Sequence, residues 1–208
     1  MRGLAASTLL AMSVGLAAGP ALACKGKLIF SDNFREVDSS WRYDGDPSVS
    51  VEDGKVKVKP SANETRNLLY RGVSLDEAEI CVTLKTSSDA PEAGAGILFW
   101  AQDDSNLYRA IISSAGTARI SKLYKDKLSA VVDWTKFPAI KQGLGATNTL
   151  GLVTRGNSAT FFINGEKFAT VKGAQPEDGW KVGLYAYSEP TKVDKWKFSD
   201  VKVTELSQ

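Results

Sequence analysis

Residues 148–172 read NTLGLVTRGNSATFFINGEKFATVK and contain the clearest structural signal in the chain, two successive strand hairpins. Asn164 and Gly165 both tolerate a positive φ, which a two-residue type I′ turn requires at its two central positions. This turn predicts that its flanking strands pair with Phe161 opposite Phe168. The stretch therefore predicts antiparallel β-structure.

A second hairpin of the same kind occurs earlier. An Asp-Gly pair at 53–54 separates VSVE (49–52) from KVKV (55–58). The same type I′ geometry predicts Val51 opposite Val56, on a face that alternates with a polar one.

The rest of the chain alternates in the same way between short apolar runs and turn residues, and no segment has a helical period. We expect strands at 27–34, 49–52, 55–59, 67–72, 78–86, 96–102, 107–113, 118–124, 128–134, 149–154, 158–163, 167–171, 181–187 and 194–204. Clusters of Gly, Asn, Asp, Ser and Pro between strands are typical of all-β sandwiches and barrels. The sequence therefore predicts an all-β, antiparallel fold of about 12–14 strands.

The N-terminus has the composition of a secretory signal peptide. Arg2 precedes an alanine-rich apolar run over residues 4–18, and Ala-Leu-Ala at 21–23 matches a small-x-small cleavage site. The apolar run is shorter than the roughly 20 residues that span a bilayer. We expect residues 1–23 to be removed on export to the periplasm or the cell exterior, and residues 24–208 to form one domain without a transmembrane segment.

Charge is nearly balanced along this chain. Its formal net charge is +2, and acidic and basic residues are interspersed throughout. Such a distribution argues against a surface that binds nucleic acid. We expect a monomer.

The two cysteines, Cys24 and Cys81, have two possible fates. An oxidising compartment favours a disulfide between them, because Cys81 faces away from the apolar side of its expected strand. The alternative is a lipid anchor on Cys24. A lipoprotein signal places a branched apolar residue three positions before the cysteine, where this chain has Ala21. We therefore favour the disulfide.

A series of short motifs occurs along the chain in a fixed order: FSDNF (30–34), Trp41, VEDGKV (51–56), AGILF (95–99), NLYR (106–109), LVTR (152–155), FING (162–165), VGLY (182–185) and FSDV (198–201). Together they resemble the concanavalin A-like lectin/glucanase superfamily, and most closely bacterial secreted domains of the laminin-G-like and 3-keto-disaccharide-hydrolase type. The resemblance implies a jelly-roll β-sandwich of two curved antiparallel sheets. It implies no single function, because this superfamily includes enzymes, lectins and interaction modules.

Several kinds of active site are excluded by composition. The chain has no histidine, the usual general base of serine and cysteine nucleophiles and the commonest transition-metal ligand. Two cysteines are too few for a zinc cage. Hydrolysis by a pair of carboxylates remains compatible with the composition, because it needs only two acids at a suitable separation.

Glu77 and Glu79 form the best such pair, because alternate residues of a strand point to the same side about 6.6–6.8 Å apart. Glucanases of the resembled superfamily carry three acids at alternate positions of one strand. This series here ends in Cys81, so the third acid is missing. The alternative, which we favour, is that both glutamates are solvated. Asp104 is a third candidate acid.

Residues 103–106 read DDSN and join two strongly apolar segments. Asp103, Asp104 and Asn106 are candidate calcium ligands, because lectins of the resembled superfamily bind calcium through loop Asp and Asn side chains. Calcium takes six to eight oxygen ligands, more than this cluster supplies. Turn chemistry explains the same residues, so we expect no cofactor.

The hairpin around this turn predicts the candidate binding surface. A four-residue loop would pair Trp100 with Arg109 on a face that mixes apolar and polar side chains and includes Gln102. An exposed indole beside a guanidinium suits a sugar, whose apolar side stacks on the ring while its hydroxyls need hydrogen-bond donors. A cation–π pair that merely covers the sheet is the alternative. Trp134 is a candidate extension of this platform.

We therefore expect a secreted, lectin-like, non-catalytic module with a glycan as its partner. One alternative is a glycoside hydrolase that acts on a modified disaccharide. Another is a structural or protein-interaction domain whose groove is filled.

Overall fold

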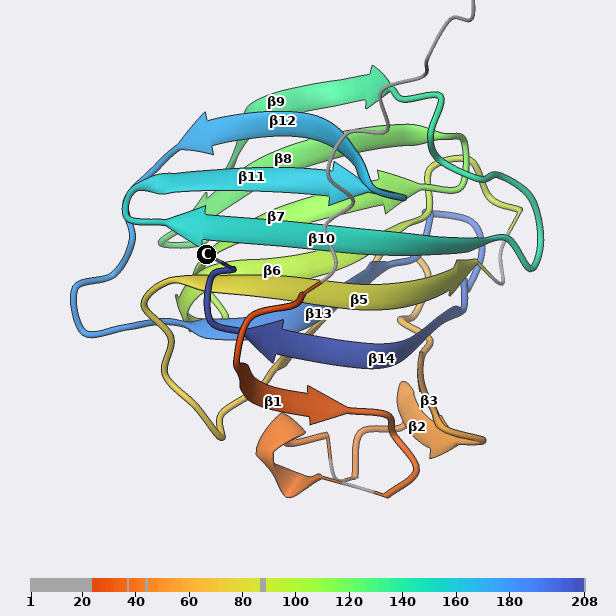
Figure 1. The fold of residues 1–208 in the computed structure, drawn as a ribbon. Helices are drawn as coiled ribbons and strands as arrows, with labels where there is room; N and C mark the ends of the chain where they lie inside the picture. The colour runs from red at the N-terminus through yellow and green to blue at the C-terminus, as the bar shows by residue number, and fades with distance from the viewer. Residues whose placement is uncertain (1–23, 37, 44, 87–88, 208) are drawn as a thin grey trace, which may run out of the picture.

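The computed structural model describes residues 24–36, 38–43, 45–86 and 89–207, and Figure 1 shows its fold. It contains one short 3₁₀ helix, η1 (Ser39–Trp41), and strands β1 (Leu28–Asp32), β2 (Val49–Glu52), β3 (Lys55–Val58), β4 (Thr65–Leu69), β5 (Ala78–Thr86), β6 (Gly94–Asp103), β7 (Asn106–Ser113), β8 (Thr117–Tyr124), β9 (Lys127–Lys136), β10 (Thr147–Arg155), β11 (Ser158–Ile163), β12 (Glu166–Lys172), β13 (Lys181–Tyr187) and β14 (Trp196–Thr204). Every expected strand is present, and the boundaries differ by a few residues at most. The all-β prediction is confirmed.

The strands form two sheets packed face to face. Sheet A has the order β12-β11-β10-β5-β14-β3-β2, with β1 also paired to β14, and sheet B has the order β4-β13-β6-β7-β8-β9. All pairings between named strands are antiparallel. In Figure 1 sheet A faces the viewer and sheet B lies behind it. This is the two-sheet jelly roll expected from the sequence.

Both Gly-containing turns have the predicted geometry. The φ angles are +53° and +65° at Asp53 and Gly54, and +52° and +85° at Asn164 and Gly165. The β2–β3 register is the predicted one. The β11–β12 register is not, because Phe161 pairs with Ala169 across a bulge rather than with the predicted Phe168.

The core lies between the sheets and is built largely from residues that face inward at alternate positions along the strands. Its largest fully buried side chains belong to four tryptophans and four phenylalanines: Trp41, Trp100, Trp180, Trp196, Phe34, Phe99, Phe161 and Phe198. Burial of such rings is the main favourable term in folding, because each removes a large apolar area from water.

Cys24 and Cys81 are joined by a disulfide with an S–S distance of 2.09 Å, as predicted. The bond ties the start of the described chain to β5 of sheet A. A sulfur in a disulfide cannot carry a thioether-linked lipid, so the structure agrees with the favoured alternative. The bond is compatible with an oxidising compartment.

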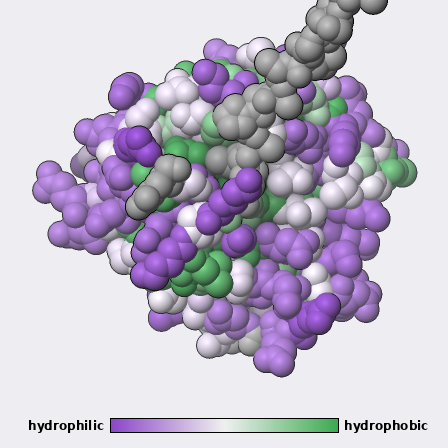
Figure 2. Space-filling model, viewed as in Figure 1, coloured by the Kyte–Doolittle hydropathy of each residue, from purple (hydrophilic) through white to green (hydrophobic). Residues whose placement is uncertain are grey.

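Hydrophilic residues predominate on the side of the molecule that carries sheet A, where its described residues are visible. Figure 2 has the same view as Figure 1 and shows hydrophobic patches among them. Within the described part of the chain, no helix is long and apolar enough to cross a membrane. The predicted signal peptide lies outside the described residues.

Candidate functional site

The predicted partnership of Trp100 with Arg109 is wrong, because β6 contains a bulge. Asp103 pairs with Asn106 at the turn, but beyond the bulge Phe99 pairs with Tyr108 and Leu98 with Arg109. Two residues of β6 are thus left over relative to β7. The chain accommodates them with Trp100 in a left-handed conformation at φ +46°, which changes the side to which its ring points.

Trp100 is consequently a core residue. It is 2% exposed, and its ring centre lies 5.2 Å from that of Phe99 and 5.1 Å from that of Tyr108. A Cβ atom on Gly173 would lie 2.5 Å from the Trp100 ring, so the indole packs against backbone there. No stacking platform is formed by Trp100.

Gln102 is exposed and also lies apart from Arg109. It lines a cavity of about 360 Å³ at the end of β6, together with Asn106, Tyr124 and the loop at 174–178. The predicted ligand residues are therefore divided. Trp100 and Gln102 border this small cavity, whereas Arg109 and Trp134 line a larger one.

The larger cavity, here called the sheet B groove, has a volume of about 650 Å³ and lies on the outer face of sheet B. Its lining residues are Thr65, Pro91, Glu92, Arg109, Ile111, Ser113, Ala115, Thr117, Arg119, Ser121, Leu128, Trp134, Tyr185 and Tyr187. A mostly apolar pocket with a few converging polar groups is the usual form of a ligand site.

The floor of the groove is a cross-strand row. Tyr185 of β13 pairs with Gly96 of β6, Gly96 with Ile111 of β7, and Ile111 with Arg119 of β8. All four positions face away from the core, because residues of a strand alternate between the two faces of a sheet. The row has no side chain at Gly96, where a Cβ atom would overlap the carbonyl oxygen of Ala110 on β7.

The apolar part of the floor forms a hydrophobic cluster separate from the main core. Its buried members are Leu69, Leu98, Ala101, Leu107, Ile111 and Tyr185. Ile111 and Tyr185 of this cluster line the groove.

Trp134 forms one wall of the groove. It belongs to the edge strand β9, is 42% exposed, and has its ring centre 5.9 Å from the guanidinium carbon of Arg119. A Cβ atom on Gly94 of β6 would lie 3.7 Å from Cη2 of this ring, so the indole reaches over β7 and β8 toward β6. Trp134 therefore presents an accessible aromatic surface.

Arg109 lies in the floor against the opposite wall. Its guanidinium carbon is 4.7 Å from the centre of the Tyr185 ring, and the residue is 7% exposed. Burial lowers the pKa of Arg109 from its ordinary value, with the nearby Arg119 acting in the same direction and Tyr185 opposing it. The group stays protonated, because an arginine pKa starts far above neutrality.

The two tyrosines of the wall are protonated at neutral pH. Burial raises the pKa of Tyr185, although Arg109 and Arg119 partly oppose this effect. Burial also raises the pKa of Tyr187, with a contribution from the exposed Glu92 at the rim. Both phenol oxygens can therefore accept hydrogen bonds, and the Tyr187 hydroxyl donates one to Asn63 Oδ1 at 3.4 Å.

The candidate acids lie elsewhere. Glu77 precedes β5 and accepts a hydrogen bond from the Gly156 amide at 2.8 Å. The expectation that Glu79 is solvated is wrong, because the residue is buried on β5 and accepts hydrogen bonds from the amide and hydroxyl of Ser207 at 3.2 and 3.1 Å. Both belong to sheet A or its margin, so the two sheets separate them from the groove.

Asp104 lies at the β6–β7 turn, where a carboxylate oxygen is 4.0 Å from the Arg71 guanidinium. Asp103 accepts hydrogen bonds from the Ser105 amide at 2.8 Å and from the Asn106 amide group at 2.9 and 3.0 Å. The Asn106 bond lowers the pKa of Asp103. These contacts are those of an Asx turn. Across the described residues, no three His, Cys, Asp or Glu side chains are grouped as metal ligands.

Another cavity, of about 830 Å³, lies between the segment after β1 and the end of β14. Two of the acids that line it, Asp32 and Asp38, have structural partners. Asp32 accepts hydrogen bonds from the Phe34 amide and from the Trp41 indole, and Asp38 caps η1 through the Ser40 amide. We regard the sheet B groove as the better candidate, because it combines aromatic walls with the buried Arg109 and the half-buried Arg119.

No model of a known protein family matches the sequence, and a comparison with curated proteins found no match. Solved structures do match. The fold is the concanavalin A-like jelly roll. The carbohydrate-binding module CBM66 from Bacillus subtilis has a TM-score of 0.60 at 12% identity, over 72% of this chain and 86% of that one.

Two further similar structures have related descriptions. A Bacillus licheniformis β-glucanase has a TM-score of 0.62 at 11% identity, over 88% of this chain and 100% of that one. The Emp47p carbohydrate recognition domain has a TM-score of 0.65 at 13% identity, over 85% of this chain and 95% of that one. These similarities establish the fold.

Arg119 and Tyr185 line the groove but were missed by the sequence predictions. Each is at an alternate position of its strand and is flanked by apolar residues, so the signal for an outward-facing polar residue was present. The pairing of β13 with β6 is not local in sequence, and it is this pairing that brings Tyr185 to Arg109.

Proposed function

We propose that this protein is a secreted, lectin-like module that binds a glycan in the sheet B groove without cleaving it. The observation that carries the proposal is the opposition of Trp134 to Arg109 and Tyr185 across a cavity of about 650 Å³. An exposed indole provides a surface for the apolar side of a sugar ring, and the guanidinium and phenol groups provide hydrogen bonds to its hydroxyls.

The carbohydrate-binding descriptions of similar structures support the same proposal. The residues differ, so the support concerns the class of ligand and not its identity. The predicted signal peptide and the disulfide support a location in the periplasm or outside the cell.

A glycoside hydrolase is the second candidate, favoured by the similarity to a β-glucanase. Glycosidases ordinarily use two carboxyl groups on either side of the scissile bond. Among the described residues that line the groove, Glu92 is the only acid, and it is exposed at the rim. This composition favours binding over hydrolysis.

A glycan array probed with purified mature protein tests the proposal, followed by incubation of each bound glycan and analysis for shorter products. Binding without cleavage is the expected result. Cleavage of a bound glycan would contradict the non-catalytic function and support the glycoside hydrolase. If no glycan on the array binds, both the glycan-binding module and the glycoside hydrolase are rejected, and the structural or protein-interaction domain remains.

A further inference from the structure

The sheet B groove contains two arginines without an acidic partner. Arg109 of β7 and Arg119 of β8 point to the same outer face, because Arg109 pairs with Ser121 and Ile111 with Arg119. The Nε atoms of both side chains are inaccessible to solvent and have no hydrogen-bond partner among the described residues. The ion pairs of the described residues include neither side chain.

A buried, unpaired cation is energetically costly, since it loses hydration without gaining a counter-charge. The effect is visible at Arg109, where desolvation and the charge of Arg119 both lower the pKa. Contact with the Tyr185 ring at 4.7 Å offsets part of this cost through a cation–π interaction. It leaves the positive charges of the pair without neutralisation.

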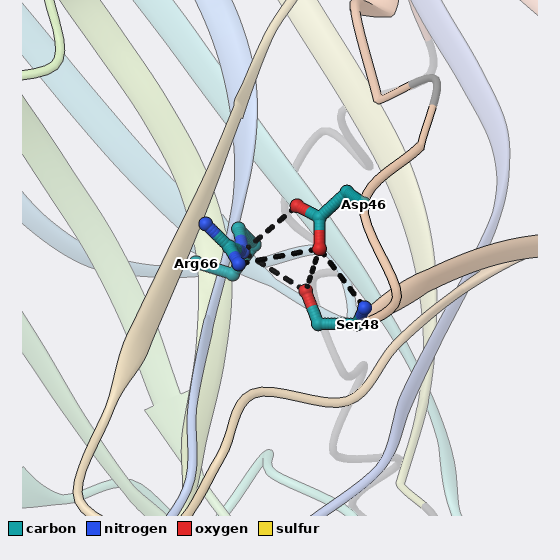
Figure 3. Close-up of polar contacts among 3 residues, drawn as sticks. All are labelled: Asp46, Ser48 and Arg66. Atoms are coloured by element: carbon teal, nitrogen blue, oxygen red, sulfur yellow. Dashed lines mark hydrogen bonds and ion pairs between the residues drawn. The ribbon is translucent and has the colours of Figure 1, made fainter.

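Arg66 shows how the same fold treats a structural arginine. Its Nε lies 3.1 Å from a carboxylate oxygen of Asp46 and donates to the Ser48 hydroxyl at 2.9 Å, while its Nη2 donates to Asp46 at 3.2 Å (Figure 3). Arg66 is thus neutralised and hydrogen-bonded. The contrast indicates that the Arg109–Arg119 pair is arranged for a ligand and not for the stability of the sheet.

Building on the proposed glycan binding, we propose that the glycan of the sheet B groove carries an oxyanion group, a uronic acid carboxylate or a sulfate ester, that is bound by Arg109 and Arg119. Guanidinium groups recognise such oxygens through charge-assisted, often paired hydrogen bonds. The sugar that bears the anion would then lie beside Trp134, whose ring is 5.9 Å from Arg119. Glu92, at the rim near Tyr187, would repel the anion there and so favour the arginine end of the groove.

Neutral sugars fit this arrangement less well. A hydroxyl accepts a hydrogen bond from a guanidinium but brings no negative charge, so the desolvated charge of Arg109 would remain uncompensated. An anionic substituent removes this cost on binding, which makes charge the basis of selectivity.

Isothermal titration calorimetry with three oligosaccharides of equal length tests the inference: a galacturonate oligomer, a sulfated galactan oligomer and a neutral galactan oligomer. We expect one charged oligomer to bind about 10-fold or more tightly than the neutral one, and to lose affinity as salt rises. Which charged oligomer binds identifies the anion as carboxylate or sulfate.

Substitutions of Arg119 test whether the anion binds in the sheet B groove. Arg119→Gln should weaken binding of the charged oligomer about 10-fold or more, the loss expected for a charge-assisted hydrogen bond, and Arg119→Lys should retain part of the affinity. Arg155→Gln is the matched control, because Arg155 is an exposed residue of β10 in sheet A. It removes the same charge and should leave affinity unchanged. Arg119 is preferred to the more buried Arg109, whose removal would also disturb the Tyr185 contact.

Each outcome is decisive. Equal affinity for the neutral and charged oligomers, with no effect of Arg119→Gln, would overturn the anion inference while leaving glycan binding in place. Equal losses in Arg119→Gln and Arg155→Gln would show a non-specific charge effect and would also overturn it. If none of the three oligomers binds and the glycan array is empty as well, the proposed function fails together with this inference.

Discussion

The rings of Trp100 and Tyr108 meet nearly at right angles, with an interplanar angle of 88° and ring centres 5.1 Å apart. This contact is possible because Trp100 is in a left-handed conformation that turns its indole to the same side of the sheet as Tyr108. The bulge thus interrupts the regular strand, adds the Trp100 ring to the core and removes it from the outer face of sheet B.

Trp100→Ala should therefore destabilise the protein. Loss of a fully buried indole is expected to lower the free energy of unfolding by about 3–5 kcal/mol, because the cavity left behind cannot be filled completely. Urea denaturation measures the effect. An unchanged denaturation midpoint would mean that Trp100 is exposed and that the bulge is absent in solution.

Prediction of the fold from sequence succeeded wherever local chemistry decides. Asp53-Gly54 and Asn164-Gly165 specify their turns by backbone conformation alone, and strict alternation specifies which residues are buried. Bulges cannot be predicted in this way, because packing against distant parts of the chain determines whether a strand contains an extra residue. The ring of Trp100 fits where it does because Gly173, far away in the sequence, has no side chain.

The candidate site follows the same division. Arg109 and Trp134 were identified because each is a conspicuous residue on an alternating strand. Tyr185 was not connected to them, since no local pattern reveals that β13 lies beside β6. The alternation within one strand thus identifies the sheet face to which a side chain points. Its neighbours on that face depend on the order of the strands in the sheet.

Gly165→Val should weaken the β11–β12 hairpin. Gly165 has φ +85°, a conformation that is strongly unfavourable for a β-branched residue, so we expect a loss of at least about 1 kcal/mol in the free energy of unfolding. Lys167→Val is the control, because it adds the same side chain at an exposed position of the adjacent strand. Equal denaturation midpoints for the two variants would contradict the turn assignment.

Gly96→Ala should destabilise the floor of the groove. A Cβ atom there would overlap the carbonyl oxygen of Ala110 on β7, so the β6–β7 pair must shift. We expect a cost of about 1–3 kcal/mol, measured from the thermal midpoint. Gly94→Ala is the control on the same strand, since its Cβ would lie 3.1 Å from the Ile111 side chain, which can move. A larger loss at Gly94 than at Gly96 would show that the floor is packed differently.

Replacing both Cys24 and Cys81 by alanine should lower the free energy of unfolding by about 2–4 kcal/mol, because the disulfide restricts the unfolded chain between two residues that are 57 positions apart. Urea denaturation of the variant and the wild type measures the difference. Intact mass after alkylation provides an independent check: the native protein should gain no alkyl group until it is reduced. A lipid adduct on Cys24 would refute the pairing.

Trp134→Ala should weaken ligand binding with little change in stability, whereas Trp100→Ala should lower stability. The Trp134 side chain is 42% exposed and lies on an edge strand, so its removal should change the free energy of unfolding by no more than about 0.5 kcal/mol. Affinity for a glycan found on the array should fall about 10-fold or more, because a tryptophan that covers a ligand contributes disproportionately to binding. Trp134→Phe should keep part of the affinity through its smaller ring. Calorimetric titration of both variants decides the role of Trp134, and full affinity in Trp134→Ala would place the sugar elsewhere, with the small cavity around Gln102 and Tyr124 as the next surface to test.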